Sequence, residues 1–248
     1  MLKKILLIIG VLGVFIGLCL INALCVNTCQ ITAKENIIET NKLKDDSNEL
    51  LIAYFSDLHY GNYIDNEFLN NVTKKINDFR PDIIIFGGDL IDGYASKGIS
   101  EIGKENIINA FDSLDAKYGK YAVFGEDDIN SDGTFDSIAN ILSQAGFKII
   151  NNDVANINVG KGNFIDIVGI NSLSYGESIS SLFADTSNYT FVVSHYPDVF
   201  SSILDYDFDY MISGHSHGGQ VYLPIISLFN RKQGCLDYYH GNYSENNK

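Results

Sequence analysis

Positive charge is scarce in this chain of 248 residues. It contains 17 lysine and arginine residues against 31 aspartate and glutamate residues, which gives a formal net charge of −14. Sequence-independent binding to a nucleic-acid backbone needs clustered lysine and arginine side chains, so we expect no nucleic acid as a partner. An acid-rich protein can still bind phosphate groups where metal ions supply the positive charge.

Cysteine is also scarce. Of the four cysteines, Cys19, Cys25 and Cys29 lie near the N-terminus, and only Cys235 lies in the rest of the chain. A disulfide within that larger part is therefore excluded, and its stability must come from a hydrophobic core. The chain offers no candidate catalytic cysteine, and nothing in the pattern indicates an obligate protein partner.

Residues 5–26 form an almost uninterrupted apolar run that Lys3 and Lys4 precede. About 20 apolar residues span a bilayer as a helix, and lysines before such a run favour a cytoplasmic N-terminus. We therefore expect residues 1–29 to anchor the chain in a membrane, with the remainder on the extracytoplasmic side. A cleaved secretory signal is the alternative, but residues 23–25 match the usual small-x-small cleavage pattern poorly.

The pattern changes twice after this run. Residues 30–49 are polar and lack a sustained apolar period, which predicts a linker, and residues 50–248 are predicted to form one domain. Short apolar runs predict buried strands over 51–55, 83–86 and 121–124. Helical spacing follows these runs over 66–79, 101–117 and 135–145. This alternation predicts an α/β fold in which helices cover a parallel sheet.

The second half of the domain has a different pattern. Residues 156–159 and 164–168 alternate between apolar and polar around a Gly-Lys-Gly-Asn turn, which predicts a β-hairpin. Two further strands are predicted over 189–193 and 208–212. We therefore expect an antiparallel portion in this half.

Histidine is rare as well, and four of the five histidines directly follow a predicted strand. Ligands collect outside the carboxyl ends of parallel strands, where the candidates are Asp57, His59, Asp89, His195, His215 and His217. Such a mixture of carboxylates and imidazoles suits divalent manganese, iron or zinc better than calcium, which prefers oxygen ligands. A bridging carboxylate with further ligands suffices for two adjacent ions, as in two-metal hydrolases. We predict metal-assisted hydrolysis, with phosphate esters as the leading substrate class.

Five motifs follow one another in a specific order. They are Asp57-x-His59, Gly88-Asp89-x-x-Asp92, Gly125-Glu126-Asp127-Asp128, Ser194-His195 and Gly214-His215-Ser216-His217. As a set they resemble the calcineurin-like metallophosphoesterase superfamily over residues 50–222, in particular its membrane-anchored or exported bacterial members. The resemblance implies a four-layer α/β/β/α sandwich of two mixed sheets, here preceded by one N-terminal transmembrane helix.

The resemblance also implies a site with two divalent metal ions, for which manganese, iron and zinc are the candidates. Asp57, His59 and His217 would hold one ion, and Asp89 would bridge to the second. His195, His215 and the residue at position 126 would hold the second ion. A hydroxide that bridges the two metals would attack phosphorus in line, so the implied activity is hydrolysis of phosphoester or diphosphate bonds.

The third motif departs from the family pattern, because Glu126 and Asp127 replace the usual asparagine and histidine. That histidine normally helps to neutralise transition-state charge and to protonate the leaving oxygen. Aspartate has an ordinary pKa of about 3.9 against about 6.5 for histidine, so it is a poorer acid catalyst near neutral pH. We assign Asp127 and Asp89 to catalysis, and we expect an enzyme that is slowed or that prefers good leaving groups such as diphosphates. The alternative is an impaired relative that binds metal or phosphate at a membrane surface.

The C-terminal end departs as well. After the fifth motif the family runs through a basic, glycine-containing loop, which residues 230–234 resemble, into further strands. Here the chain stops at Lys248. We therefore expect at least one C-terminal strand of the usual fold to be missing.

Overall fold

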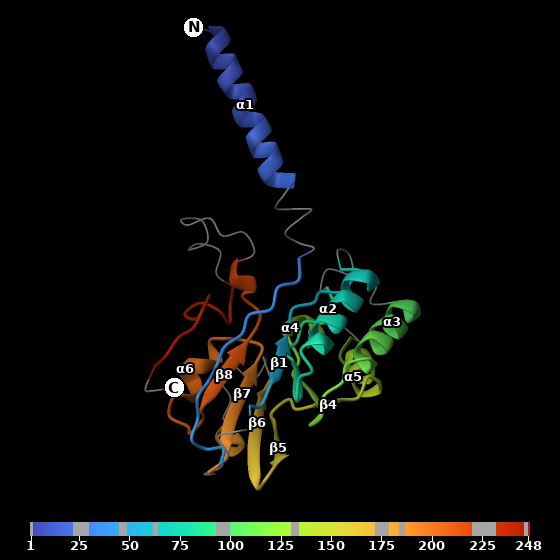
Figure 1. Ribbon diagram of the computed structural model, residues 1–248, viewed down its shortest axis with the longest axis vertical. Coiled ribbons are helices and arrows are strands. Elements are labelled where there is room, and N and C mark those ends of the chain that lie inside the picture. The colour runs from blue at the N-terminus through green and yellow to red at the C-terminus, as the bar shows by residue number, and fades with distance from the viewer. Residues whose placement is uncertain are drawn as a thin grey trace. The chain divides into compact units, whose positions relative to one another are not determined.

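The computed structural model describes most of the chain, which divides into two units, Met1–Ile38 and Glu39–Lys248 (Figure 1). The described residues are 2–21, 30–44, 49–61, 64–92, 100–129, 134–171, 179–183, 187–219, 232–245 and 248. The predicted boundaries at residues 29 and 49 differ from this division. Part of the predicted linker belongs to the second unit, where Lys42 Nζ lies 2.9 Å from Asp209 Oδ2.

The first unit contains helix α1, Leu2–Ile21. Residue 1 and residues 22–29 of the predicted anchor lie outside the described residues. Within the described part of the chain, no helix is both long and apolar enough to cross a membrane. The predicted transmembrane helix is therefore not supported, and an extracytoplasmic location stays a prediction.

The second unit begins with a parallel sheet of four strands in the order β1-β2-β3-β4. The strands are β1 Ile52–Phe55, β2 Ile83–Phe86, β3 Lys120–Ala122 and β4 Phe147–Ile149. The helices are α2 Asn66–Asp78, α3 Glu101–Asp112, the short α4 Glu126–Ile129 and α5 Thr134–Gln144. The predicted strands and helices of this half are confirmed, and β4 is an additional strand that the pattern did not predict.

A second sheet has the order β5-β6-β7-β8. Its strands are β5 Asp153–Gly160, β6 Asn163–Ile170, β7 Tyr189–Ser194 and β8 Tyr210–Ser213. The predicted hairpin is confirmed, because β5 and β6 pair in antiparallel fashion, whereas β7 and β8 continue the sheet in parallel. Short helical turns complete this half: η4 Ser180–Leu182, α6 Val199–Ile203 and η5 His217–Gly219.

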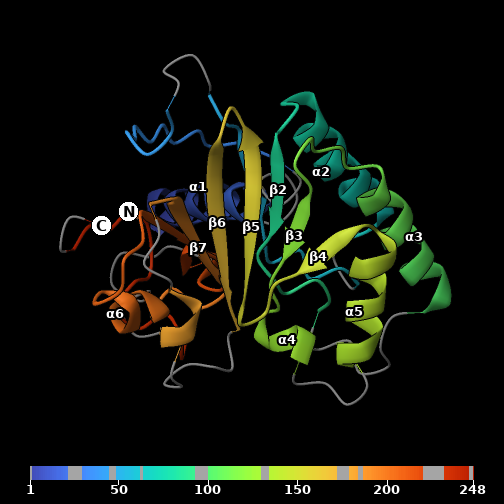
Figure 2. The ribbon, with the colours of Figure 1, turned by 90° about the horizontal axis from the view of Figure 1, so that it is seen from below.

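The two sheets pack face to face through one hydrophobic core. Ile83 and Ile85 of β2 contribute to it from the first sheet, and Ile165 and Ile167 of β6 contribute from the second. The alternate residue Phe86 packs instead against Phe111 of α3, because neighbouring side chains of a strand point to opposite faces. Helices α2, α3 and α5 lie on this outer face of the first sheet (Figure 2). Both faces of β2 are therefore buried, which explains its unbroken apolar sequence.

The outer face of the second sheet is covered by shorter pieces of chain. Phe200 and Ile203 of α6 pack there with Tyr238 and with Val192 of β7. After β8 the described residues contain no strand, and residues 220–231, which include the start of the predicted basic loop, lie outside the described part. Two sheets with helical segments on their outer faces agree with the predicted α/β fold. The prediction of two mixed sheets is wrong for the first sheet, whose described strands are all parallel, whereas the second sheet is mixed.

Candidate metal centre

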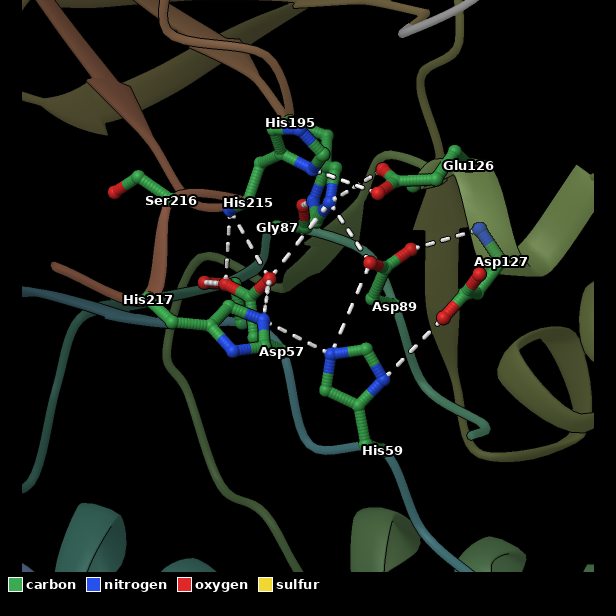
Figure 3. A network of polar contacts seen from close by, with 12 residues as sticks. Asp57, His59, Gly87, Asp89, Glu126, Asp127, His195, His215, Ser216 and His217 are labelled. Atoms are coloured by element: carbon green, nitrogen blue, oxygen red, sulfur yellow. Dashed lines mark hydrogen bonds and ion pairs between the residues drawn. The ribbon is translucent and has the colours of Figure 1, made fainter. Parts of the chain in front are cut away.

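The loops that follow β1 and β2 are held side by side beyond the ends of these strands. Asp57 N donates to the carbonyl of Gly88 over 2.9 Å, and His59 N donates to that of Asp89 over 3.1 Å. From the second sheet, His215 N donates to both carboxylate oxygens of Asp57 over 3.0 and 3.1 Å. The carboxyl ends of strands from both sheets therefore meet at one site (Figure 3).

Five of the predicted site residues have left-handed backbones. Their φ angles are 55° for Asp57, 45° for His59, 56° for Asp89, 66° for His215 and 49° for His217. Each such residue costs on the order of 1–3 kcal/mol and persists only where its surroundings hold it in this conformation. This concentration of strain indicates that contacts within the site, and not the intrinsic backbone preferences of these residues, determine the conformation of the loops.

Glycine allows the loops to approach the two aspartates closely. A Cβ atom on Gly214 would lie 2.5 Å from Asp57 Oδ2, and one on Gly125 would collide with Asp89 Oδ1. Any larger residue at either position would displace the carboxylate. These two glycines therefore belong to the motifs for a steric reason.

Four side chains form an inner group in which each residue offers one ligand atom within 4.8 Å of the others: Asp89, Glu126, His195 and His215. Nε2 of His195 lies 3.1 Å from Asp89 Oδ2 and 3.0 Å from Glu126 Oε2, and Nδ1 of His215 lies 2.7 Å from Glu126 Oε1. Yet Glu126 Oε2, His195 Nε2 and His215 Nδ1 are buried and have no partner in hydrogen-bond geometry within the described chain.

Backbone carbonyls decide which nitrogens of the inner group can bind a cation. His195 Nδ1 lies 2.7 Å from the carbonyl oxygen of Gly87, and His215 Nε2 lies 2.8 Å from that of Gln233. Because a carbonyl only accepts, each of these nitrogens must donate a proton. The opposite nitrogen of each ring then faces carboxylates, and it offers a lone pair to a cation when the ring is neutral. The donor set therefore fits a divalent metal ion.

Three further side chains form an outer group that meets the same 4.8 Å criterion: Asp57, His59 and His217. His217 Nε2 lies 3.2 Å from Asp57 Oδ1 and 3.0 Å from His59 Nε2. His59 also shares a potential ligand set with Asp89 and Asp127. Asp89 therefore lies between the inner and the outer group, as a bridging carboxylate would.

The charges of these groups act on one another. Burial opposes the ionisation of Asp57, but its hydrogen bond with His217 and the nearby charge of His195 lower its pKa to about 2. Burial likewise opposes ionisation of Glu126, yet His195 and His215 hold its pKa well below the usual range. Burial lowers the pKa of His195, but Asp89 and Glu126 raise it well above its ordinary value. The carboxylates that attract a proton to His195 would attract a metal cation in the same way.

Asp127 lies at the edge of the outer group. Its carboxylate Oδ2 is 3.4 Å from His59 Nδ1, and its backbone N donates to Asp89 Oδ1 over 3.0 Å. The structure thus brings together all eight predicted site residues (Figure 3). Their binding of metal and their part in catalysis stay predictions.

Sequence reasoning missed the function of Asp128. This fully buried carboxylate accepts hydrogen bonds from the backbone N–H groups of Asp89, Leu90 and Gly125 over 2.8 to 2.9 Å. Burial and the charge of Asp89 raise its pKa to about 7. Asp128 joins the loops after β2 and β3, so it holds Asp89 and Glu126 in register. The sequence shows three consecutive acids in the third motif, but it does not show which of them points into the protein interior.

The fifth histidine also lies closer to the site than its sequence context indicates. A Cβ atom on Gly218 would be 3.1 Å from His240 Nδ1. The exposed His240 ring therefore packs against the backbone next to His217. No sequence signal marks this contact, because it joins a described segment near the C-terminus to a turn more than 20 residues earlier.

Known proteins resemble this chain over the same region. Residues 50–219 match the calcineurin-like phosphoesterase family. The uncharacterized metallophosphoesterase YkoQ of Bacillus subtilis is 32% identical over 203 residues, which cover 80% of this chain and 70% of YkoQ. The uncharacterized metallophosphoesterase YkuE of the same organism is 28% identical over 199 residues, which cover 79% of this chain and 68% of YkuE.

A more distant relative has a named activity. The UDP-2,3-diacylglucosamine pyrophosphatase LpxG of Chlamydia trachomatis is 26% identical over 224 residues, which cover 71% of this chain and 65% of LpxG. The family match includes all five motifs and the strands that bring them together. The chain therefore belongs to the calcineurin-like phosphoesterase family.

Proposed function

We propose that this protein hydrolyses phosphoester or diphosphate bonds with the help of two divalent metal ions, for which manganese, iron and zinc are the candidates. One observation carries the proposal. Two groups of ligand atoms meet at Asp89, and three buried atoms of the inner group lack hydrogen-bond partners within the described residues. The two imidazole nitrogens lie at ion-pair distance from the Glu126 carboxylate but without hydrogen-bond geometry. Buried polar atoms without hydrogen bonds are costly, so a cation is the partner that this geometry favours.

Each side chain has a distinct part in the proposed reaction. One metal ion would be held at the buried end of the site by Glu126, His195 and His215. The other would be held at the more open end by Asp57, His59 and His217. Asp89 joins the two ends and sets their separation. Bound divalent ions would supply positive charge for the phosphoryl oxygens and lower the pKa of a water molecule between them. Asp57 and Glu126, held ionised by their histidine neighbours, contribute negative charge that retains the cations.

Asp127 narrows the proposed range of substrates. Its carboxylate lies beside His59 Nδ1, where it can orient that imidazole in the manner of carboxylate–histidine–metal arrangements. It does not replace an imidazolium as a proton donor to the leaving oxygen. General acid catalysis is typically worth about 10²–10⁴-fold in rate, so substrates that need little protonation of the leaving group are favoured. Diphosphates meet this condition, and the name of the similar LpxG, a pyrophosphatase, supports the choice.

The same departure supports a second candidate function. Glu126 and Asp127 put two carboxylates where the family has neutral or basic side chains, and this added negative charge repels an anionic substrate. A protein of this kind would bind metal and turn over phosphate substrates poorly. It would then act as a metal-binding protein, and any phosphate would bind only through the metal ions.

A turnover assay on the full chain separates the two functions. The protein is depleted of metal, reloaded with manganese, iron or zinc, and assayed with bis(4-nitrophenyl) phosphate and with a nucleoside diphosphate sugar. We expect metal-stimulated hydrolysis that is lost in Asp89→Asn. Stoichiometric metal binding without turnover of either substrate would contradict the enzyme and favour the second candidate.

A further inference from the structure

A segment near the C-terminus lies against the inner group of the metal centre. Residues 232–245, called the C-terminal segment here, reach the site at their first end, where the carbonyl of Gln233 lies 2.8 Å from His215 Nε2. This contact leaves Nδ1 of His215 as the nitrogen that faces Glu126. The geometry of the inner group therefore depends on a backbone carbonyl from outside the five motifs.

Buried Asp198 holds this end of the segment in place. Its side chain, only 1% exposed, accepts hydrogen bonds from the backbone N–H groups of Leu236, Asp237 and Tyr238 over 2.6, 3.0 and 3.1 Å. Its own backbone N donates to the carbonyl of Gly234 over 2.9 Å. Although Asp198 precedes α6, its side chain forms no capping hydrogen bond to that helix. Its acceptor capacity is directed to the C-terminal segment.

Packing completes the connection between Asp198 and His215. Gly234 has a φ angle of 91°, and a Cβ atom on it would lie 2.6 Å from Cγ of Tyr196. The ring of Tyr196 in turn lies 4.5 Å from the ring of His215, measured between centroids. Gln233 is thus followed directly by a residue that is confined on one side by Tyr196 and on the other by its bond to Asp198.

We propose that Asp198 is a positioning residue of the metal centre: by holding residues 234–238, it keeps the Gln233 carbonyl on His215 Nε2 and so directs His215 Nδ1 toward the metal. This inference rests on the metal site of the proposed function. The partner that orients a metal-binding histidine typically changes metal affinity by about 10–100-fold. We expect a change in metal affinity of the same size here, about 10–100-fold, although Asp198 acts on His215 indirectly through the backbone of the C-terminal segment.

The test measures binding of Mn²⁺ alone to the metal-free full chain by titration calorimetry. In Asp198→Asn, an NH₂ group faces backbone N–H donors, so at least one of the three hydrogen bonds is lost. We expect the dissociation constant of one Mn²⁺ site to rise about 10–100-fold. The matched control is Tyr238→Phe, which removes the 2.7 Å hydrogen bond from Tyr238 to Glu245 further along the segment. It should bind Mn²⁺ as the wild type does.

A second pair of variants acts without touching Asp198. Gly234→Ala introduces the collision with Tyr196, whereas Gly241→Ala has a similar φ angle of 95° with no atom within 4 Å of the new Cβ. Both variants therefore strain the backbone of the C-terminal segment, but only the first displaces the end next to Gln233. We expect weaker Mn²⁺ binding in Gly234→Ala and unchanged binding in Gly241→Ala. This pair decides the matter if Asp198→Asn does not fold.

A spectroscopic measurement separates positioning from a merely structural role. In the zinc-loaded full chain, NMR reports the exchange of the His215 Nε2 proton with solvent. We expect a protected proton in the wild type and in Tyr238→Phe, and rapid exchange in Asp198→Asn. Wild-type Mn²⁺ affinity and a protected proton in both Asp198→Asn and Gly234→Ala would overturn the proposal. An inactive wild type that binds Mn²⁺ would contradict only the enzymatic function, because neither readout uses turnover.

Discussion

The inner and outer groups of the metal centre differ in burial and in what orients their imidazoles. His195 and His215 of the inner group have side chains that are 0% and 3% exposed, whereas those of His59 and His217 are 25% and 19% exposed. Backbone carbonyls of Gly87 and Gln233 orient the inner rings. Of the outer rings, His59 has the carboxylate of Asp127 beside its Nδ1, whereas Nε2 of His217 faces Asp57, a member of the same group.

This difference indicates a division of labour. Backbone carbonyls keep their place when solvent or substrate enters, so the inner group is suited to retaining a metal ion. The outer group is more exposed to solvent, so under the proposed function it is the side from which a phosphate substrate would approach. Asp89 belongs to the inner group and also forms a potential ligand set with His59 and Asp127, so it links the two halves.

The largest effect is expected from Asp89→Asn, which removes one negative charge from both halves at once. We expect turnover to fall by more than about 100-fold, the upper end of the range for partners that only orient a ligand. Metal content, measured by mass spectrometry after dialysis, should fall below that of the wild type. A variant that retained full metal content and activity would show that the two halves do not depend on Asp89.

Asp128→Asn should destabilise the inner half through its backbone. In the wild type, three backbone N–H groups share the two carboxylate oxygens of Asp128. The amide of the variant has only one acceptor oxygen, so at least one buried N–H group is left unpaired. Such a loss costs about 1–3 kcal/mol, which urea unfolding of the manganese-loaded protein would measure. Asp136→Asn, an exposed acid on α5, is the control and should change stability by less than about 0.5 kcal/mol. Equal effects in both variants would contradict the role given to Asp128.

Asp127→His should act on the outer half alone. An imidazole at this position restores a proton donor. We therefore expect the turnover of an alkyl phosphate ester, which has a poor leaving group, to rise by about tenfold. This rise lies below the usual effect of general acid catalysis, about 10²–10⁴-fold, because the wild-type site around residue 127 accommodates a carboxylate. Turnover of bis(4-nitrophenyl) phosphate should change little, and Asp78→His at the exposed end of α2 should leave both rates unchanged. If turnover of the alkyl ester does not rise, the explanation of Asp127 by leaving-group preference is wrong.

The smallest effect is expected far from both halves. Lys42→Ala removes the 2.9 Å ion pair with Asp209, in which both side chains are partly exposed. Pairs of this kind contribute about 0–1 kcal/mol, so thermal unfolding should shift slightly and metal affinity should not change. A loss of metal affinity in this variant would indicate that the site responds to the whole fold and not to its own loops.

Much of the fold was predictable because burial leaves a clear pattern. The unbroken apolar residues of β2 follow from burial on two faces, and the alternation in β5 follows from burial on one. Strand β4 was missed because its three residues contain a lysine and follow closely after α5. The segment around Lys42 was assigned to a linker because its contacts lie more than 100 residues away, at Asp209.

The sequence by itself determined which side chains reach the site. Apolar strands must be buried, and parallel strands bring their carboxyl ends to one edge of their sheet, so Asp57 and Asp89 had to meet at one edge and the histidines after β7 and β8 at another. The packing of the two sheets then brought these edges together. Only the tertiary structure decided which atom of each imidazole faces the metal centre and which residues hold the loops. The carbonyls of Gly87 and Gln233 orient the imidazoles. Hydrogen bonds from backbone N–H groups to Asp128 and Asp198 hold the loops. Backbone groups are the same in every residue, and therefore leave no trace in the sequence.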